Sequence, residues 1–292
     1  MLHTLNYPLI SIIIPLYNKQ DCIIKTIESI TTQGFDSYEI VVVDDGSTDK
    51  SVAIVKDLNN EKIKIFQKEN GGPASARNYG VEHATGKWGL FLDADDTLEP
   101  GSLKLLENLV QKEPDCEFFC CNHYVQANNI KTLFSSKFKE GYVRNNFFAY
   151  QTKRIRPRAG AAIFSMSLLK KYPYNEQFRR YEDADCVFNI MRNTRAYTSP
   201  VPIMTYNRNN AEASRPRKDI KEDYIGSLSY EGKGRWEQLT LYNLYLQGCR
   251  AYPDDMKRLY DPKKMYNNKV KICKKIITLL TLVGYIKPKI RR

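Results

Sequence analysis

The first hundred residues alternate short apolar runs with segments of helical spacing. The apolar runs are continuous and rich in β-branched residues, as in strands that are buried on both faces. They occupy residues 9–14, 39–43, 62–66 and 88–92. One helix is predicted over residues 19–33, and another is predicted to begin at about Pro73. Between them, a further helix is predicted after the second apolar run, where Ser47 or Thr48 can cap it. This alternation predicts an α/β fold with a mostly parallel sheet flanked by helices, and ligands at the carboxyl ends of its strands.

The pattern after residue 114 is less regular. EFFCCNHYV (117–125) predicts a further strand, AAIFSMSLLKKY (161–172) predicts a helix or a strand–helix pair, and another helix is expected to begin near Glu182. Residues 126–160 are basic and aromatic-rich without a clear period. Residues 207–235 are polar and charged, which is typical of a mobile loop.

The composition fits a folded protein of 292 residues with a sizeable core, since 42% of the residues are hydrophobic. The seven cysteines lack metal-ligand spacing and indicate a reducing compartment. The longest apolar stretch, residues 276–286, has 11 residues, whereas a helix that spans a bilayer needs about 20. The N-terminus lacks the pattern of a signal peptide, so we expect a cytoplasmic protein.

The positive charge is concentrated at the C-terminal end of the sequence. Residues 262–292 contain ten Lys and Arg and no Asp or Glu, so they supply +10 of the formal net charge of +12. One helical face there carries Ile272, Ile276, Leu279 or Leu280, and Val283. This basic amphipathic tail is predicted to rest on an anionic membrane surface, at the inner face of the cell membrane; the alternative is a helix packed on the protein itself. No recognition motif indicates nucleic-acid binding.

Three carboxylates, Asp93, Asp95 and Asp96, directly follow the fourth predicted strand. Their mutual repulsion could be offset by Mg²⁺ or Mn²⁺, which prefer oxygen ligands, or the cluster could be a solvated turn. The sequence DADDT also fits a haloacid dehalogenase-like phosphatase, with Asp93 as the nucleophile and Asp95 as acid/base. That motif normally lies on the first strand of its domain, whereas three predicted strands precede it here.

Polar loops follow three of the predicted strands and would converge on one crevice. PLYN follows the first strand, DDGS the second and DADD the fourth. The sequence has no P-loop and no dinucleotide-binding glycine motif after the first strand. Any nucleotide is therefore expected to bind in another way.

Four motifs in order, SIIIPLYN, EIVVVDDGSTD, NGGPASARNYGVEHATG and FLDADD, resemble family 2 glycosyltransferases with a GT-A fold. The resemblance is specific over residues 8–110 and looser from 115 to about 208. It implies an enzyme that moves a sugar, with inversion, from a nucleoside-diphosphate-sugar to an acceptor hydroxyl. It also implies Mn²⁺ or Mg²⁺ as cofactor, a UDP-sugar as the favoured donor, and a saccharide or lipid-linked saccharide acceptor in cell-surface polysaccharide or glycolipid assembly.

On this resemblance, the donor nucleotide is bound by residues of the first three motifs. Pro15 and Tyr17 match the edge that holds the base, and Asp45, with Asp44 beside it, would accept hydrogen bonds from the base. Arg77 matches a basic residue near the nucleotide, the alternative being a salt bridge on a helix surface. Asn78 is expected to support this loop.

The remaining assignments concern the metal and the proton transfer. Asp95 is the expected metal ligand, Asp93 is directed toward the ribose and the metal, and Asp96 lies behind them. Glu182 and Asp183 match a downstream acidic pair, in which Asp183 is the catalytic base; a capped helix start is the alternative.

The expected organisation follows from these assignments. Residues 1–112 would bind the nucleotide-sugar, and residues 113–208 would form the acceptor side of the same domain. Residues 209–261 are expected to form a polar loop and a helical extension, followed by the basic tail.

Overall fold

Ten strands form one sheet in the computed structural model, which describes residues 8–208 and 219–282. The strands are β1 (Ile10–Leu16), β2 (Tyr38–Asp44), β3 (Ile63–Gln67), β4 (Trp88–Phe91), β5 (Thr97–Leu98), β6 (Phe118–Ala127), β7 (Ile130–Leu133), β8 (Gly141–Tyr142), β9 (Ala162–Ser165) and β10 (Tyr197–Asn207). The main path through the sheet runs β3-β2-β1-β4-β9-β6-β10-β5, with β7 paired to β6 and β8 paired to β10.

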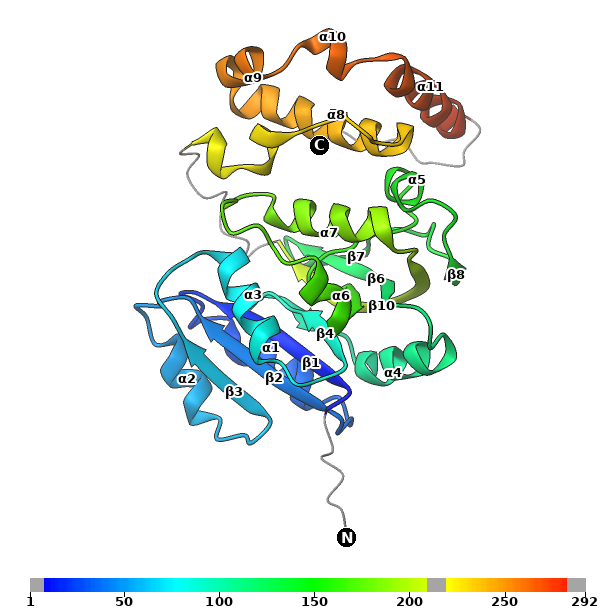
Figure 1. Ribbon diagram of the computed structural model, residues 1–292. Helices are drawn as coiled ribbons and strands as arrows, with labels where there is room; N and C mark the ends of the chain where they lie inside the picture. Colours follow the sequence, from blue (N-terminus) through cyan, green and yellow to red (C-terminus); the bar gives the residue numbers. More distant parts are fainter. Residues whose placement is uncertain (1–7, 209–218, 283–292) are drawn as a thin grey trace.

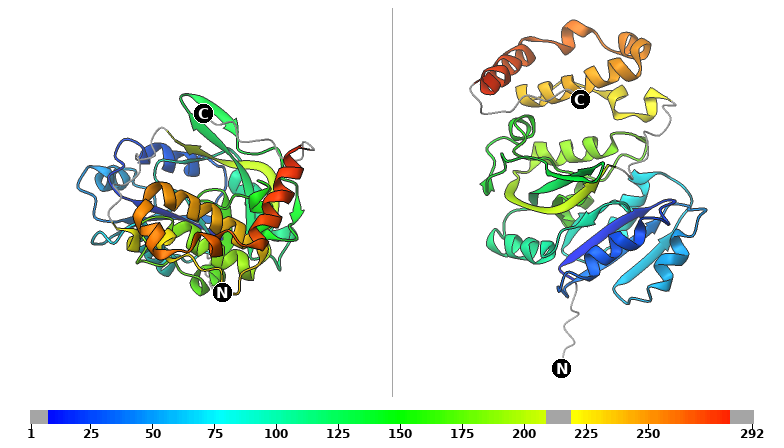
Figure 2. Two further views of the ribbon diagram at one scale, coloured as in Figure 1. Left: turned by 90° about the horizontal axis from the view of Figure 1, so that it is seen from above. Right: turned by 180° about the vertical axis from the view of Figure 1, so that it is seen from behind.

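The helices cover both faces of this sheet and add a further layer beyond it (Figure 1). They are α1 (Ile23–Thr31), α2 (Ser51–Asp57), α3 (Pro73–His83), α4 (Ser102–Lys112), α5 (Asn146–Gln151), α6 (Met166–Lys171), α7 (Glu182–Asn193), α8 (Arg235–Ala251), α9 (Pro253–Leu259), α10 (Pro262–Met265) and α11 (Asn268–Leu282), with 3-10 turns η1 (Ile220–Glu222) and η2 (Tyr224–Ser227). Helices α8 to α11 lie on the far side of α5 and α7 from the sheet, as Figure 1 and the right view in Figure 2 show.

The N-terminal half has the predicted parallel arrangement. β1 pairs in parallel with both β2 and β4, and β2 pairs in parallel with β3. In the sheet, β2 and β3 therefore lie on one side of β1, and β4 lies on its other side. The carboxyl ends of β1 and β4 flank this reversal of strand order, which is where open α/β sheets bind ligands.

Two hydrophobic clusters fill the two faces of the sheet. Alternate residues of β1 divide between them, since Ile13 belongs to one cluster and Ile12 and Ile14 belong to the other. Close packing positions α3 on β1, because a Cβ added at Gly80 would lie 2.4 Å from Ile13 Cγ2. Gly80 is therefore needed for α3 to hold its side chains over the end of β1.

The second half of the sheet is mixed. β9 runs antiparallel to β4 and β6, whereas β10 runs parallel to β6. Strand β10 was not apparent from the sequence, because Pro200 and Pro202 interrupt its pattern. The ladder accommodates them by register shifts between Ser199 and Pro202 and between Pro202 and Thr205.

The structure corrects two predicted helix starts. α1 begins at Ile23 rather than at Lys19. The backbone amides of Asn18 and Lys19 instead donate to Ser47 Oγ (3.0 Å) and Ser51 Oγ (2.8 Å), which locks the loop after β1 to the loop after β2. α2 begins at Ser51 without a side-chain cap, so the predicted capping by Ser47 or Thr48 is wrong.

The prediction of a mobile loop over 207–235 is also wrong for the part that the structure describes. Two 3-10 turns, η1 and η2, bury Ile220, Tyr224 and Ile225 against the helices. Tyr224 packs edge-on against Phe188 of α7, with 6.4 Å between ring centroids. Burial of these apolar side chains holds the segment against the helices despite its polar composition.

Helix α11 divides its apolar residues between two sides. Val270 and Cys273 are fully buried, and Ile276 packs on the core. Ile272 and Leu279 are 51% and 60% exposed. The predicted apolar face is therefore split between packing on α8 and solvent exposure, while Val283 lies outside the described residues. Within residues 8–208 and 219–282, no helix combines the length and apolar character needed to span a membrane.

Candidate active site

A pocket of about 300 Å³ opens at the carboxyl ends of β1, β2 and β4. Its lining includes residues from all three loops that were predicted to converge: Pro15, Tyr17, Lys19, Asp45, Asp93 and Asp95. Arg77 from α3 and Glu182 from α7 complete the lining on the side of the second half of the sheet. The structure therefore places most of the predicted site residues around one pocket.

Asp45 fastens the loop after β2 to the start of α3. Its carboxylate is buried and accepts hydrogen bonds from the backbone amides of Gly71 (2.8 Å) and Gly72 (2.7 Å) and from Lys68 Nζ (3.0 Å). Gly72 has a φ of 88°, which favours glycine. A carboxylate offers about four lone-pair sites, so one remains for a ligand.

Asp44 lies behind the pocket and does not line it. Its Oδ1 accepts a hydrogen bond from the backbone amide of Ser47 (3.1 Å), and its Oδ2 accepts one from Gln67 Nε2 (3.4 Å). Asp44 thus shapes the turn that presents Asp45.

Arg77 joins the two halves of the site. It is only 6% exposed, and its guanidinium donates to Asp93 Oδ1 (2.9 Å) and to Glu182 Oε1 (3.1 Å). The group also lies over the ring of Tyr174, 5.3 Å from the centroid. The alternative of a surface salt bridge is wrong, because Arg77 is buried. Arg77 Nε is buried and has no hydrogen-bond partner in the part of the chain that the structure describes.

The acidic cluster after β4 is neutralised by three different means. Asp93 pairs with Arg77, and Asp95 Oδ2 pairs with Lys19 Nζ at 2.8 Å. Asp96 is 1% exposed, and its Oδ1 accepts a hydrogen bond from the backbone amide of Asn207 (2.8 Å). Burial raises the pKa of Asp96 to about 8, and the nearby charge of Asp93 adds to this increase. The raised pKa favours the uncharged form of Asp96, which lessens the repulsion expected from three adjacent carboxylates.

The start of α7 places Glu182 and Asp183 beside the pocket. Glu182 contacts Arg77, and burial raises the pKa of its carboxyl while Arg77 opposes this effect. Asp183 is exposed and lines a small adjoining cavity of about 50 Å³, together with Arg77, Asp93 and Arg158. Its Oδ1 accepts a hydrogen bond from the backbone amide of Ala184 at 2.8 Å. An exposed carboxylate next to the pocket is suited to accept a proton.

Asn78 holds the segment on which Arg77 rests. Its side chain donates to the carbonyl of Tyr174 (2.9 Å), accepts from the amide of Tyr174 (2.9 Å) and donates to Glu176 (2.8 Å). Asn78 thereby fixes Tyr174 below the guanidinium of Arg77.

Among the residues that line these cavities, Lys19, Arg158, Arg179 and Tyr206 were not predicted from the sequence. Lys19 directly follows the PLYN motif, and Arg179 lies three residues before Glu182, so basic residues next to the motifs were an available signal. Arg158 stacks on Tyr206 at 3.4 Å from the ring centroid, a contact between segments that the sequence gave no reason to connect.

Four carboxylates line the pocket, and among them Asp93 and Asp95 both follow β4; their oxygens are suited to a hard divalent cation. Their side chains are 37% and 14% exposed. Residues 8–208 and 219–282 hold no group of three or more His, Cys, Asp or Glu placed to bind a metal ion. A cation at Asp95 would therefore need further ligands from a diphosphate and water, which is a common arrangement for Mg²⁺.

The first half of the sheet is parallel, and an acidic pocket lies where its strand order reverses. The second half of the sheet is mixed, and helix α7 from that half completes the pocket. Together these features define the GT-A class of fold. The crystal structure of S. aureus TarS 1-349 in complex with UDP has this fold, with a TM-score of 0.61 and 22% identity; the match covers 94% of this chain and 91% of the TarS 1-349 chain. Residues 11–178 match the family described as glycosyl transferase family 2, and the chain belongs to that family.

Curated relatives match the same region. An uncharacterized glycosyltransferase of Rickettsia bellii is 41% identical over 175 residues, which cover 60% of this chain and 25% of the relative. The GalNAc(5)-diNAcBac-PP-undecaprenol beta-1,3-glucosyltransferase of Campylobacter jejuni is 31% identical over 177 residues, covering 59% of this chain and 56% of the relative. The matches thus span a quarter to somewhat over half of these relatives. The comparisons give no support to the phosphatase alternative.

Proposed function

We propose that this protein transfers a sugar from a nucleoside-diphosphate-sugar to an acceptor hydroxyl, with inversion at the anomeric carbon. The observation that carries the proposal is the single pocket at the reversal of strand order, where Asp45, Arg77 and Asp95 converge and Asp183 lies alongside. Family membership supports the same reaction. The assembly of a glycolipid or cell-surface polysaccharide is supported by the lipid-linked saccharide in the name of the C. jejuni relative.

In the proposed reaction, Asp183 takes the proton from the acceptor hydroxyl as its oxygen bonds to the anomeric carbon. The bond between that carbon and the diphosphate oxygen breaks, and the nucleoside diphosphate leaves with the electron pair. Arg77 and Lys19 place positive charge where the diphosphate would lie. The exposed ring of Tyr17 and the neighbouring Pro15 would hold the base, and Asp45 would accept a hydrogen bond from it.

A UDP-sugar is the favoured donor in this proposal, and TarS structures with UDP and with UDP-GlcNAc support that choice. Asp95, with Asp93 beside it, would hold Mn²⁺ or Mg²⁺. The bound cation would stabilise the negative charge on the departing diphosphate. Because Lys19 pairs with Asp95 Oδ2 at 2.8 Å, cation binding would require Lys19 to share or release this oxygen.

The proposed donor and metal sites predict a selective stabilisation of the folded chain. UDP-sugars with Mn²⁺ should raise the unfolding temperature more than GDP-sugars or CDP-sugars, because a ligand that binds only the folded state stabilises it by mass action. Asp95→Ala should remove the part of the shift that depends on Mn²⁺. A thermal-shift screen with Mn²⁺ or with EDTA measures both effects. The metal assignment would be contradicted if a UDP-sugar raised the unfolding temperature of Asp95→Ala and of wild type equally at every Mn²⁺ concentration.

We also propose that the exposed side of α11 docks on an anionic membrane, which would place the enzyme at the inner face of the cell membrane. Ile272 and Leu279 are seven residues apart, so they share one side of the helix, and both are exposed. Lys271 and Lys275 are exposed on the same helix. Apolar side chains flanked by lysines are suited to an anionic interface.

Replacing both exposed apolar residues, as Ile272→Ser/Leu279→Ser, is expected to reduce binding of the full chain to phosphatidylglycerol-containing vesicles by about a hundredfold, since two buried apolar side chains together contribute ~3 kcal/mol or more. Sedimentation with vesicles measures this effect. Ile130→Ser/Leu259→Ser is a matched control, because these residues are 63% and 46% exposed on other elements. Equal partitioning of the two double variants would contradict docking through α11.

A further inference from the structure

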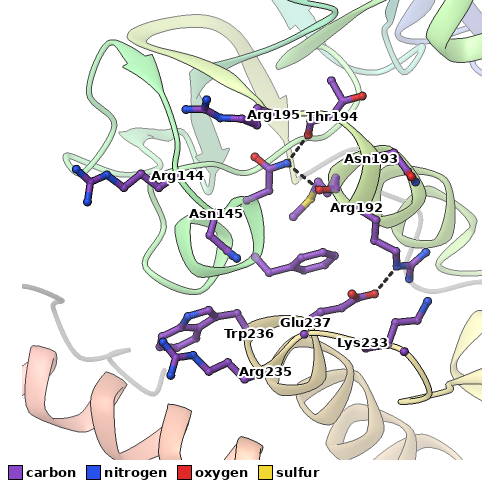
Figure 3. Close-up of a pocket in the computed structure, with 15 residues that line it drawn as sticks. Arg144, Asn145, Arg192, Asn193, Thr194, Arg195, Lys233, Arg235, Trp236 and Glu237 are labelled. Carbon is purple, nitrogen blue, oxygen red and sulfur yellow. Dashed lines mark hydrogen bonds and ion pairs between the residues drawn. The ribbon is translucent and has the colours of Figure 1, made fainter.

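A second, larger pocket of about 720 Å³ lies between the C-terminal end of α7 and the start of α8 (Figure 3). One wall consists of residues 144–147 and 191–195, which belong to the half of the molecule that carries the sheet. The other wall consists of residues 232–237, at the start of the C-terminal helical layer. The function proposed above makes no use of this pocket.

The lining of this pocket is strongly basic. Five cationic residues line it, namely Arg144, Arg192, Arg195, Lys233 and Arg235, and the lining contains one carboxylate, Glu237. Glu237 forms an ion pair with Arg192. Across the part of the chain that the structure describes, the other four cations form no ion pair with a carboxylate at 4 Å or less. The pocket therefore carries a concentrated positive charge that the protein itself does not neutralise.

Aromatic rings support two of these cations. Arg195 lies over the ring of Tyr142 at 5.2 Å, and Arg235 lies over the ring of Trp236 at 5.7 Å. As Figure 3 shows, Arg144 and Arg195 come from one wall and Arg235 from the other. An anion between the walls could thus be contacted from both sides by guanidinium groups, which bind phosphate with paired hydrogen bonds.

The backbone around the pocket is also arranged in favour of an anion. The carbonyls at the end of α7 would repel negative charge, but Asn146 Nδ2 donates hydrogen bonds to the carbonyls of Met191 (2.9 Å) and Thr194 (2.6 Å). The 17-residue helix α8 begins at Arg235 without a side-chain cap, so its positive end faces the same space.

The pocket is separate from the site proposed for the donor. Glu182 and Asp183 form the N-terminal end of α7, whereas Met191 to Asn193 form its C-terminal end. A helix of 12 residues is about 18 Å long, so the two pockets lie at well-separated ends of α7. A ligand here must therefore be a different molecule, or a remote part of the acceptor.

We propose that this pocket binds a phosphate or diphosphate group carried by the acceptor. The assignment to the acceptor rests on the proposed transferase function, because the donor diphosphate already has a site at the opposite end of α7. The acceptor would then be an elongated, phosphate-bearing molecule whose reactive hydroxyl lies near Asp183.

The test compares two double variants of the full chain by titration with inorganic pyrophosphate in EDTA. Arg144→Gln/Arg235→Gln removes one cation from each wall and breaks no ion pair, and it should weaken binding at least tenfold. Lys170→Gln/Arg250→Gln removes the same charge from exposed positions outside the pocket and should change binding less than twofold. Equal affinity in the two double variants would overturn the proposal, because binding would then follow net charge only.

Two further arms distinguish the sources of the phosphate and the role of the donor site. Weaker binding of Arg144→Gln/Arg235→Gln to phosphatidylcholine vesicles that contain a polyprenyl diphosphate would support a lipid-linked acceptor. A loss limited to soluble phosphate esters would support a soluble one. UDP binding should be the same in both double variants; if wild type binds pyrophosphate through Arg144 and Arg235 but does not bind UDP, the transferase proposal fails while the anion pocket remains.

Discussion

Replacing Asp183 with asparagine is expected to reduce turnover of the donor sugar by about 10²–10⁴-fold, the usual contribution of a general base. Asparagine keeps the shape of the side chain and can still accept the hydrogen bond from the Ala184 amide, which is 2.8 Å long in the native chain. It cannot take the proton of the acceptor hydroxyl. Because Asp183 lines the adjoining cavity rather than the donor pocket, donor affinity should stay within about twofold, on the order of the error in such comparisons.

Release of UDP from the donor, measured with UDP binding on the same samples, tests this expectation. Asp185→Asn is the matched control, because Asp185 is on the same first turn of α7 but lines neither cavity. The control should retain turnover within a fewfold range. Full turnover by Asp183→Asn, or an equal loss in Asp185→Asn, would remove Asp183 from the proposed role.

Replacing Arg77 with methionine is expected to lower the free energy of unfolding by about 3 kcal/mol, because removing one partner of a buried ion pair leaves the others uncompensated. Asp93 and Glu182 would both lose their partner, at 2.9 and 3.1 Å respectively. Asp93 is 37% exposed and can be solvated, which places the expected value at the lower end of the range for buried pairs. Donor binding should be lost as well, because Arg77 lines the pocket.

Urea unfolding of the full chain measures the change in stability. Arg258→Met is a suitable control, since Arg258 is 72% exposed and pairs with Asp255 on the surface of α9. It should alter the free energy of unfolding by no more than about 0.5 kcal/mol. If Arg77→Met costs less than about 1 kcal/mol, the guanidinium does not hold the two halves of the site together as described.

The part of the site that the sequence predicted follows from the parallel sheet. Strands that are buried on both faces have continuous apolar sequences, and the carboxyl ends of parallel strands lie at the same edge of the sheet. The positions of Asp45 and Asp95 near one pocket could therefore be predicted from the residues after β2 and β4. The start of α7 at Glu182 was also predictable, from apolar spacing and from carboxylates in the first turn.

The remaining features depend on contacts between distant segments. Lys19 reaches Asp95 because the loop after β1 is locked to the loop after β2, and no local pattern indicates this contact across 76 residues. Strand β10 contains two prolines and is held by long-range pairing with β6. The basic pocket between α7 and α8 forms only when the C-terminal layer packs on the first 208 residues, so its cations appear scattered in the sequence.

In the proposed function, the pocket at the ends of β1, β2 and β4 binds the nucleotide of a sugar donor. Calorimetric titration of the full chain with UDP and Mn²⁺ tests it most directly, in wild type, Tyr17→Ala and the control Tyr266→Ala. Tyr17 and Tyr266 are 38% and 37% exposed, but only Tyr17 lines the pocket. We predict one UDP site per chain, an affinity about tenfold lower in Tyr17→Ala through the loss of base stacking, and no change in Tyr266→Ala. Absence of UDP binding to wild type, or equal affinity in Tyr17→Ala, would contradict binding of the donor nucleotide in this pocket.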